Sequence, residues 1–467
     1  MPEKYHIPTK AMPPRLRRVG RLGVVEWRED CARCHNCVKK DCVFDRYRQE
    51  TTYIRGLQDV DTFFYECMGC FSCVQKCTKG ILALAANPVY ERLGNSYFTP
   101  DIIETTWNQA ETASIPVSGA GYRGKFTGPG FDSMWTDMSE IVRPTRDGIH
   151  GREYISTSVD IGRKPSLLHF ENEQLLDVNV PLVDIPMPLI IDMMPAEYNL
   201  HNLTPYLLGA AARTHLLAIV DSREWDKSGS QLEKFLPNVV FYLSHDAPLP
   251  EKDVLQKTKL VEISYDDNVE QRIKAIKGLC PEIVVAVRVE LDAQGIERAI
   301  DLAHCETIEV IHLVADSTGN QIGVPNPRFV ADMVRQIHTT LVKDGSRDGI
   351  TLMAGGGIAL AEHMAKQLLC GADLITMNLP LLVALECRLC ARCQPGPACP
   401  ARVDEIGADY AVGRMTNLIS AWHSQLLEVM GAMGIREARR LRGEAGRALF
   451  FKDLEEETFG RLFGKRK

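Results

Sequence analysis

The sequence predicts an α/β protein whose middle part is a closed (β/α)8 barrel, with cysteine-rich segments before and after it. Two observations predict this architecture. Between residues 188 and 382, eight short apolar runs alternate with amphipathic stretches. Twelve of the 15 cysteines fall in three tight groups outside that region. With 467 residues, the chain is long enough for two or three domains and a large core.

The eight apolar runs are rich in Val, Ile and Leu and largely lack polar alternation, which is typical of strands buried on both faces. They cover residues 189–193, 216–221, 239–243, 260–265, 283–289, 308–316, 350–357 and 374–378. Between them lie stretches with helical spacing, such as "NVEQRIKAIKGL" and "AQGIERAIDLAH". Eight consecutive βα units favour a closed barrel, and an open doubly wound sheet is the structural alternative.

Composition and charge narrow the class of protein. The net charge of −7 argues against a general nucleic-acid-binding role. No apolar run approaches the roughly 18 residues of a spanning helix. The first 18 residues are basic and contain four prolines, but they lack the apolar core of a signal peptide. We expect either an extended arm that lies over the barrel or a partner, or a disordered tail.

The first two cysteine groups each open with the spacing C-x2-C-x2-C, which wraps three thiolates around one [4Fe–4S] cluster. In two-cluster ferredoxins the fourth cysteine of each group binds the other cluster. One predicted ligand set is Cys31, Cys34, Cys37 and Cys77, and the other is Cys67, Cys70, Cys73 and Cys42. Zinc is the alternative, but zinc prefers separated C-x2-C pairs. Clustered cysteines without a signal peptide indicate metal binding in a reducing, cytoplasmic compartment.

A third cysteine group, "CRLCARCQPGPAC", follows the barrel. Its members are Cys387, Cys390, Cys393 and Cys399. Four thiolates permit another [4Fe–4S] cluster, and three of them would permit a [3Fe–4S] cluster. The spacing alone does not choose between these clusters, and zinc remains an alternative.

Active sites of such barrels lie at the carboxyl ends of the strands. The run Gly355–Gly357 ends the seventh predicted strand, and Asn378 ends the eighth. Loops after these two strands often bind phosphate through backbone N–H groups. Beside iron–sulfur clusters, FMN is the natural phosphate-bearing cofactor, because a flavin exchanges both single electrons and hydride. The alternative interpretation of the glycines is a plain tight turn.

A second glycine pattern, Gly119-x-Gly121-x-x-Gly124, has the spacing of a dinucleotide-binding loop. Such a loop needs a strand before it and a helix after it. Pro116 breaks the segment before the pattern, and the run 128–130, Gly-Pro-Gly, prevents a helix after it. We therefore expect a glycine-rich connection at the barrel entrance and not an NAD site.

The segments "PVSGAGYRGKFTGPGFDSMWTDMSEIVRPTRDGIHG", "AGGGIALAEHMAKQLLCGADLI" and "PLLVALECRLCARC" resemble the FMN-binding glutamate synthase family. The likeness is to archaeal-type and related members that carry a two-cluster ferredoxin segment ahead of the barrel. It implies FMN in the barrel and the third cluster, at Cys387, Cys393 and Cys399, next to the flavin. It also places two groups of residues at the FMN phosphate: Gly355, Gly356 and Gly357, and Gly371, Ala372 and Asp373.

The sequence also departs from the family pattern. Pro2 stands where a full glutamate synthase has the catalytic cysteine of its glutamine amidotransferase domain, so we expect no such domain here. No "GQKPGEGG"-type stretch of the 2-oxoglutarate site is present, and "ADSTGNQIG" replaces the "GAEGGTGA"-like stretch. The predicted domains are an extended arm (1–22), a ferredoxin-like domain with two [4Fe–4S] clusters (23–95), a glycine-rich connecting segment (96–187), the FMN barrel (188–386), and the third cluster loop with C-terminal helices (387–467).

These features predict an iron–sulfur flavoprotein oxidoreductase that passes electrons between the clusters and FMN. Arg288 is expected to stabilise negative charge on the flavin, unless it only pairs with a neighbouring carboxylate. His245, His312 and Asp316 are candidate proton donors, unless His312 points into the barrel wall.

Two functions fit this chemistry. The family reaction would reduce a 2-oxoglutarate-derived imine to glutamate, with ammonia from a separate amidotransferase subunit. The alternative is an electron-transfer subunit of a larger redox complex, with no substrate of its own. Both predict a hetero-oligomer with a redox partner such as a ferredoxin or a flavin reductase. A zinc-stabilised barrel enzyme without electron transfer is the third interpretation.

Overall fold

The computed structural model describes residues 5–16, 19–26, 43, 62–63, 70–80, 82–115, 130–131, 134–136, 155–164, 170–171, 174–175, 180–198, 203–225, 232–390, 393, 399–444 and 448–464. Five of the predicted cluster ligands lie outside these residues: Cys31, Cys34, Cys37, Cys42 and Cys67. The pattern Gly119 to Gly124 also lies outside them.

Eight parallel strands close into a barrel in the order β10-β11-β12-β13-β14-β15-β16-β9. They are β9 (Leu189–Ile191), β10 (Ala218–Asp221), β11 (Val239–Leu243), β12 (Leu260–Ser264), β13 (Val284–Glu290), β14 (Val310–Val314), β15 (Thr351–Gly355) and β16 (Leu374–Met377). The first and last strands meet through the pairs Ile375↔Leu189 and Met377↔Ile191. The predicted closed barrel is confirmed, and the open sheet is excluded.

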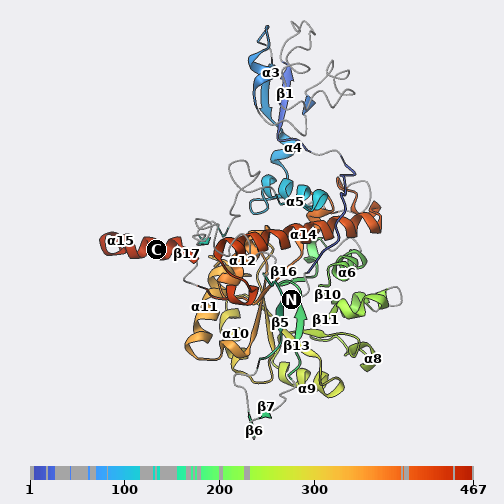
Figure 1. The fold of residues 1–467 in the computed structure, drawn as a ribbon, viewed down its shortest axis with the longest axis vertical. Helices are drawn as coiled ribbons and strands as arrows, with labels where there is room; N and C mark the ends of the chain where they lie inside the picture. Colours follow the sequence, from blue (N-terminus) through green and yellow to red (C-terminus); the bar gives the residue numbers. More distant parts are fainter. Residues whose placement is uncertain are drawn as a thin grey trace.

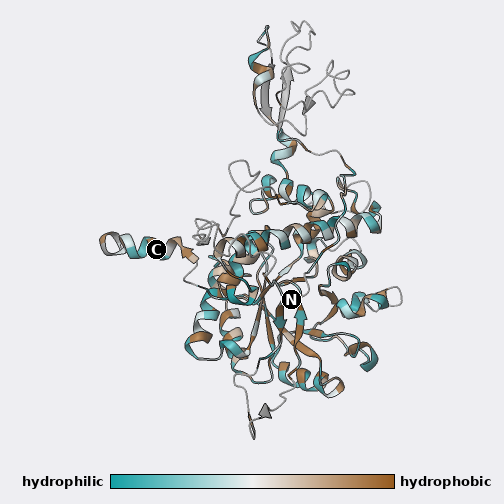
Figure 2. Cartoon of the chain, viewed as in Figure 1, coloured by the Kyte–Doolittle hydropathy of each residue, from teal (hydrophilic) through white to brown (hydrophobic). Residues whose placement is uncertain are grey.

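Helices surround the barrel, as Figure 1 shows. They include α6 (Thr204–Arg213), α8 (Lys252–Leu255), α9 (Val269–Leu279), α10 (Gly295–His304), α11 (Val330–Lys343) and α12 (Ala361–Leu369). A 3-10 helix, η5 (Glu233–Asn238), precedes β11. In Figure 2 the barrel strands are mainly brown, whereas the outer helices carry both brown and teal. In α10, for example, Ala299, Leu302 and Ala303 are buried at helical spacing.

A second helical layer lies over one end of the barrel (Figure 1). The 26-residue α14 (Ala408–Met433) packs against α5 (Pro100–Thr112), α6, α12 and α13 (Leu379–Ala384). Trp422 of α14 is fully buried, and its indole N–H donates to the side chain of Gln109 on α5 at 3.2 Å. These contacts join the connecting segment before the barrel to the helices after it.

The N-terminal strands form a separate antiparallel sheet in the order β2-β1-β3. These are β1 (Leu22–Glu26), β2 (Thr62–Phe63) and β3 (Leu82–Ala86), accompanied by α3 (Ser72–Gln75) and α4 (Pro88–Glu91). This sheet lies at one end of the molecule, and the hairpin β6 (Phe170–Glu171) to β7 (Gln174–Leu175) lies at the other (Figure 1).

Two further strand pairs and a terminal helix complete the described elements. Strand β4 (Met134–Thr136) pairs with β17 (Ala448–Phe450), and β5 (Val159–Ile161) pairs with β8 (Val183–Ile185). Helix α15 (Phe451–Phe463) ends the described chain and projects from the body in Figure 1. Among the described helices, none combines the length and apolar character that a membrane span requires.

Candidate active site at the barrel mouth

Five polar side chains meet inside the barrel near the carboxyl ends of its strands, and we call them the polar ring. They are Asp192, which follows β9, Glu262 of β12, Arg288 of β13, His312 of β14 and Thr376 of β16. Asp192, Glu262, His312 and Thr376 are at most 3% exposed. The ring therefore combines charge, burial and the end of the barrel where chemistry occurs in this architecture.

Arg288 is held by two carboxylates. Its Nη1 atom donates to Asp192 Oδ1 at 3.0 Å and to Glu262 Oε1 at 2.8 Å. Its Nη2 atom donates to Asp192 Oδ2 at 3.1 Å. The guanidinium thus pairs with two buried carboxylates, through a bidentate contact with Asp192 and a single contact with Glu262.

His312 and Thr376 close the ring on the other side. The Nδ1 atom of His312 lies 3.2 Å from both carboxylate oxygens of Glu262, and its Nε2 atom lies 3.0 Å from Thr376 Oγ1. Thr376 Oγ1 is in turn 3.4 Å from Asp192 Oδ2. Each member therefore has a partner within the ring.

The charges in the ring determine its protonation. Burial alone would raise the pKa of Asp192 and of Glu262, because desolvation disfavours the charged form. Arg288 and His312 outweigh burial and hold both carboxyl pKa values below their ordinary range. The same carboxylates raise the pKa of Arg288 against the effect of its own burial. Both acids are therefore ionised at neutral pH, and Arg288 is charged.

Strand register brings these residues together. In the parallel ladder Arg288 lies opposite His312, and Ser264, two residues after Glu262, lies opposite Arg288. Barrel closure then brings Asp192 to Thr376, because the N–H of Asp192 donates to the carbonyl of Met377 at 2.9 Å. The contacts span 184 residues of sequence in the case of Asp192 and Thr376.

The structure places the predicted catalytic residues Arg288, His312 and Asp316, and their catalytic roles remain predictions. Arg288 pairs with neighbouring carboxylates, and His312 points into the barrel interior. Asp316 follows β14, and its Oδ1 atom accepts from the N–H of Thr318 at 2.9 Å and of Asn320 at 2.8 Å. Asp316 therefore closes the loop after β14 and is not part of the polar ring.

The glycine run Gly355–Gly357 lies at the mouth, as predicted. A Cβ on Gly355 would lie 2.3 Å from Thr376 Oγ1 and 3.1 Å from His312 Nε2, so its backbone passes directly over the ring. Gly356 and Gly357 have φ values of +91° and +67°, which side chains rarely adopt. A Cβ on Gly357 would lie 2.5 Å from Cα of Gly319. The hydroxyl of Tyr97, from the connecting segment, donates to the carbonyl of Gly357.

The second predicted phosphate group, Gly371, Ala372 and Asp373, lies elsewhere. These residues precede β16, so they are at the amino end of the barrel, opposite Gly355–Gly357. Asp373 pairs with Arg347 at 2.7 Å and with Arg442 at 3.2 Å. The prediction that both groups serve one FMN phosphate site therefore does not agree with the parallel strand direction.

Asn378 lies at the mouth, where it caps α13. Its side chain accepts from the N–H of Leu379 at 2.7 Å and donates to the carbonyl of Met193 at 3.3 Å. It therefore ties the loops that follow β9 and β16 together.

The third cysteine group lies beside the mouth, one short helix beyond Asn378. Cys387 and Cys399 are buried, and Cys390 and Cys393 are partly buried. Burial, with the neighbouring cysteines, raises the pKa of Cys387 to about 12, although the N–H of Leu389 donates to its sulfur at 3.4 Å. The same cysteines contribute to the raised pKa of Tyr198, which lies in the 3-10 helix η4 (Ala196–Tyr198) after β9.

Metal ligation itself is not established by the described residues. Among them, no three His, Cys, Asp or Glu side chains gather as a metal site would require. Of the second cysteine group, Cys70, Cys73 and Cys77 lie on and around α3. The assignments of cysteines to clusters remain predictions.

Sequence analysis missed Glu262, Thr376 and Tyr97 as site residues. Glu262 had a signal, because it is a charged residue within the apolar strand "LVEIS". Thr376 in "LITM" and Tyr97 in the connecting segment carry no such signal, since their roles depend on contacts far away in the sequence.

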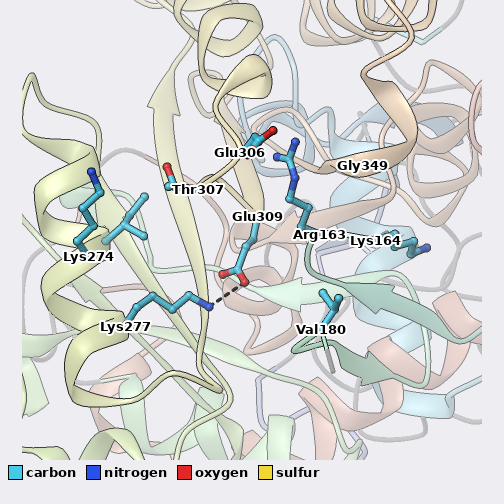
Figure 3. Close-up of a pocket in the computed structure, with 10 residues that line it drawn as sticks. Arg163, Lys164, Val180, Lys274, Lys277, Glu306, Thr307, Glu309 and Gly349 are labelled. Atoms are coloured by element: carbon cyan, nitrogen blue, oxygen red, sulfur yellow. Dashed lines mark hydrogen bonds and ion pairs between the residues drawn. The ribbon is translucent and has the colours of Figure 1, made fainter. Parts of the chain in front are cut away.

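A cavity of about 640 Å³ lies away from the mouth (Figure 3). Thr307 and Glu309 precede β14 and line it together with Arg163 and Lys277, so it lies at the amino end of the barrel. Lys277 pairs with Glu309 at 2.8 Å, and Arg163 donates to the carbonyls of Cys305 and Ile308. The charged groups of Arg163 and Lys277 are therefore already bound by other residues of the fold.

Comparisons with known proteins bear on the whole chain. Residues 249–436 match the conserved region in glutamate synthase. An archaeal-type glutamate synthase [NADPH] of Dehalococcoides mccartyi is 24% identical, over 90% of this chain and 93% of its own. An archaeal glutamate synthase [NADPH] of Archaeoglobus fulgidus is 23% identical, over 94% and 96%. A solved structure of a mandelate oxidase mutant covers 66% of this chain with 13% identity and a TM-score of 0.39, a similarity too low to bear on function.

Proposed function

Because this chain carries the glutamate synthase conserved region and is distantly homologous to archaeal-type glutamate synthases over most of its length, we propose that it is an iron–sulfur flavoprotein oxidoreductase of that type. FMN would lie over the polar ring, and electrons would pass between it and the cysteine-held clusters. One observation carries the proposal: only α13 separates Asn378 at the mouth from Cys387 of the third cysteine group.

The residues at the mouth fit a flavin phosphate. Gly356 and Gly357 present backbone without side chains, and within the described part of the chain no backbone hydrogen bond uses their N–H groups. Backbone N–H groups before a helix are ready ligands for phosphate, and α12 follows this run. After β10, the buried hydroxyl of Ser222 has no hydrogen-bond partner among the residues that the structure describes, and it would be free to bind a polar edge of the cofactor.

The third cysteine group fits a cluster by its chemistry. It supplies four thiols, and bound iron would deprotonate the ligating ones. Positive φ values at Glu386, Leu389 and Arg402 turn the backbone around the sulfurs. Cys387 already accepts an N–H hydrogen bond, an interaction that tunes cluster potentials.

FMN, when bound, would supply the transfer of single electrons and of hydride. The chain's own residues would position the cofactor and hold a proton near it. The ionised Glu262 carboxylate can only accept a hydrogen bond, so it keeps a proton on Nδ1 of His312. His312 Nε2 and the hydroxyl of Thr376 form the next link toward the mouth. Arg288, fixed by two carboxylates, keeps this line of groups in place.

The substrate proposal follows the name of the relatives. The reaction would reduce the imine of 2-oxoglutarate to glutamate, with ammonia from a separate amidotransferase subunit.

A second candidate function is supported by the polar ring itself. Its one arginine is matched by Asp192 and Glu262, so the ring offers no unmatched cation to a dicarboxylate. This balance favours an electron-transfer subunit that passes electrons to a redox partner and has no substrate of its own.

Anaerobic purification, with counts of iron, sulfide and flavin per chain, tests the proposal. One FMN and iron for three clusters support it, and protein with neither chromophore would refute it. Reduced protein is then mixed with 2-oxoglutarate and ammonia. Glutamate formation with flavin reoxidation supports the family reaction, whereas reoxidation by a ferredoxin but not by 2-oxoglutarate supports the electron-transfer subunit.

A further inference from the structure

The N-terminal arm runs along α14 and α5. The N–H of Lys10 donates to Asn417 of α14 at 3.4 Å, and the Asn417 side chain donates back to the carbonyl of Lys10 at 2.7 Å. The N–H of Met12 donates to the carbonyl of Glu111 at 2.9 Å, and Arg414 of α14 donates to the carbonyl of Met12 at 2.9 Å. Backbone groups make these contacts, so the path of the arm is fixed largely independently of its side chains.

At the end of this path, Arg15 reaches both ends of the third cysteine loop. Its N–H donates to Glu386 Oε1 at 2.9 Å, and its Nε atom lies 3.4 Å from Glu386 Oε2. Its Nη2 atom donates to the carbonyl of Ala401 at 2.7 Å. Glu386 directly precedes Cys387, and Ala401 is two residues after Cys399. One arginine therefore bridges the two points where the loop leaves the rest of the fold.

The environment makes this bridge more than a surface ion pair. The Glu386 side chain is only 7% exposed and that of Arg15 is 23% exposed. Glu386 has a φ of +68°, a conformation that needs support from its surroundings. Its carboxylate also accepts from the N–H of Leu16 at 3.4 Å. Hydrogen bonds to a shielded charge are stronger than those between neutral groups.

The same arm continues to the N-terminal sheet. Asn87, which caps α4, donates to the carbonyl of Gly20 at 2.7 Å, and its N–H donates to the carbonyl of Arg21 at 3.0 Å. The N–H of Gly94, just after α4, donates to the carbonyl of Arg388 inside the cysteine loop at 2.8 Å. The segment that carries the first two cysteine groups is thus attached to the third one from two directions.

We propose that Arg15 is a positioning residue for the third cluster. By binding both Glu386 and Ala401, it holds the two ends of the Cys387–Cys399 loop together and so keeps that cluster in place beside the barrel mouth. We call this contact the Arg15 clasp. The part of this inference that concerns iron rests on the proposed function. The contact of Arg15 with the two ends of the loop concerns only residues described above. It can be measured without iron, by the rate of trypsin cleavage in the loop.

The test uses the full chain, purified without oxygen, as wild type, Arg15→Gln, Arg15→Lys and Lys10→Gln. Lys10 lies in the same arm with an exposed side chain, and the arm uses only its backbone, so Lys10→Gln is a control with the same change of charge. A Cys387→Ser variant identifies the paramagnetic resonance signal of the third cluster by its absence. FMN content and circular dichroism report whether each variant folds.

Arg15→Gln should lose third-cluster iron to a chelator about 10-fold faster than wild type, because it loses the ion pair with Glu386 and the hydrogen bond from a charged donor to Ala401, while the backbone hydrogen bonds to Glu386 remain. Arg15→Lys should fall between them, because an amine can pair with Glu386 but cannot also span to Ala401. Lys10→Gln should match wild type. Trypsin should also cut Arg15→Gln faster than wild type at Arg388 and Arg402, with or without iron.

Equal chelation and cleavage rates in wild type and Arg15→Gln would overturn the clasp, even with all clusters present. Wild-type protein with an intact FMN but no third-cluster signal would overturn the proposed function at this loop. Faster cleavage of Arg15→Gln in that same protein would still support the clasp. If Arg15→Gln does not fold, a Glu386→Gln variant, which keeps an oxygen acceptor but loses the charge, should show the same faster cleavage.

Discussion

Replacing Glu262 by Gln tests whether the polar ring is held by charge. The substitution keeps the size and an oxygen acceptor but removes the negative charge that faces Arg288 at 2.8 Å and His312 at 3.2 Å. Removing one partner of a buried ion pair costs about 3–5 kcal/mol. Asp192 still holds Arg288 through two contacts, so we expect the lower end, about 3 kcal/mol of unfolding free energy.

Thermal unfolding followed by circular dichroism measures this loss. For a domain of the barrel's size, about 3 kcal/mol corresponds to a fall in Tm of roughly 6–12 °C at pH 7. Glu290→Gln is the control, because Glu290 is an exposed carboxylate at the end of the same strand as Arg288. Its Tm should stay close to that of wild type, since exposed substitutions change stability by about 0.5 kcal/mol or less.

The pH dependence gives the sign of the effect. The pKa of Glu262 is lower in the folded protein than its ordinary value, so its contribution is present above the unfolded pKa of about 4.3. The contribution is lost as pH falls through the folded pKa. The Tm difference between wild type and Glu262→Gln should therefore shrink on acidification. A difference near zero at pH 7, or one that does not change with pH, would refute the electrostatic account.

Four further outcomes follow from the structure. Burial raises the pKa of Glu362 to about 7, so the stability of wild type should fall as pH rises from about 4.5 through 7. In denaturant titrations, Glu362→Gln should match the stability of wild type at acid pH and exceed it by about 3 kcal/mol at pH 8. Tyr97→Phe removes the hydroxyl that donates to Gly357 and should weaken FMN binding about 5-fold in fluorescence titrations, and unchanged affinity would contradict a role at the mouth. Gly357→Ala should cost at least about 1 kcal/mol in thermal unfolding because of its positive φ and close contact, whereas Gly278→Ala, in open space on α9, should gain about 0.5–1 kcal/mol. Cys387→Ser should remove one cluster signal and leave those of the N-terminal groups, and loss of all signals together would contradict separate clusters.

The barrel was predictable because its signal is local. Strand β11 occupies the predicted residues 239–243, and the other strands lie within their predicted runs or within one residue of them. The run at 308–316 shortens to Val310–Val314, because Asp316 turns the chain into a loop through its side chain. Apolar runs alternating with amphipathic stretches were enough to find the eight strands of the barrel and its closure.

The site was only partly predictable, because its contacts are not local. Arg288 and His312 stood out as polar residues on buried strands, but their partners Asp192 and Glu262 come from other strands that only barrel closure and register bring near. The prediction that Gly371 lies at the FMN phosphate had a related weakness. The family resemblance named the residues but did not consider that they precede β16 and so lie at the other end of the barrel. An extended arm was one of the two expectations for the first residues, but its course along α14 and α5 had no signal, because most of these contacts use backbone groups of the arm.

Because the barrel sheet is closed, it has no edge strand to which another protein could add a strand. In the part of the chain described here, unpaired strand sides belong only to small sheets, and the three-stranded one at the N-terminal end has β2 and β3 outermost. Among the described residues, a partner that recognises this protein by adding a strand would have to bind one of these small sheets, and the N-terminal one is the largest of them. A partner that binds the barrel itself would have to contact its surrounding helices and loops instead.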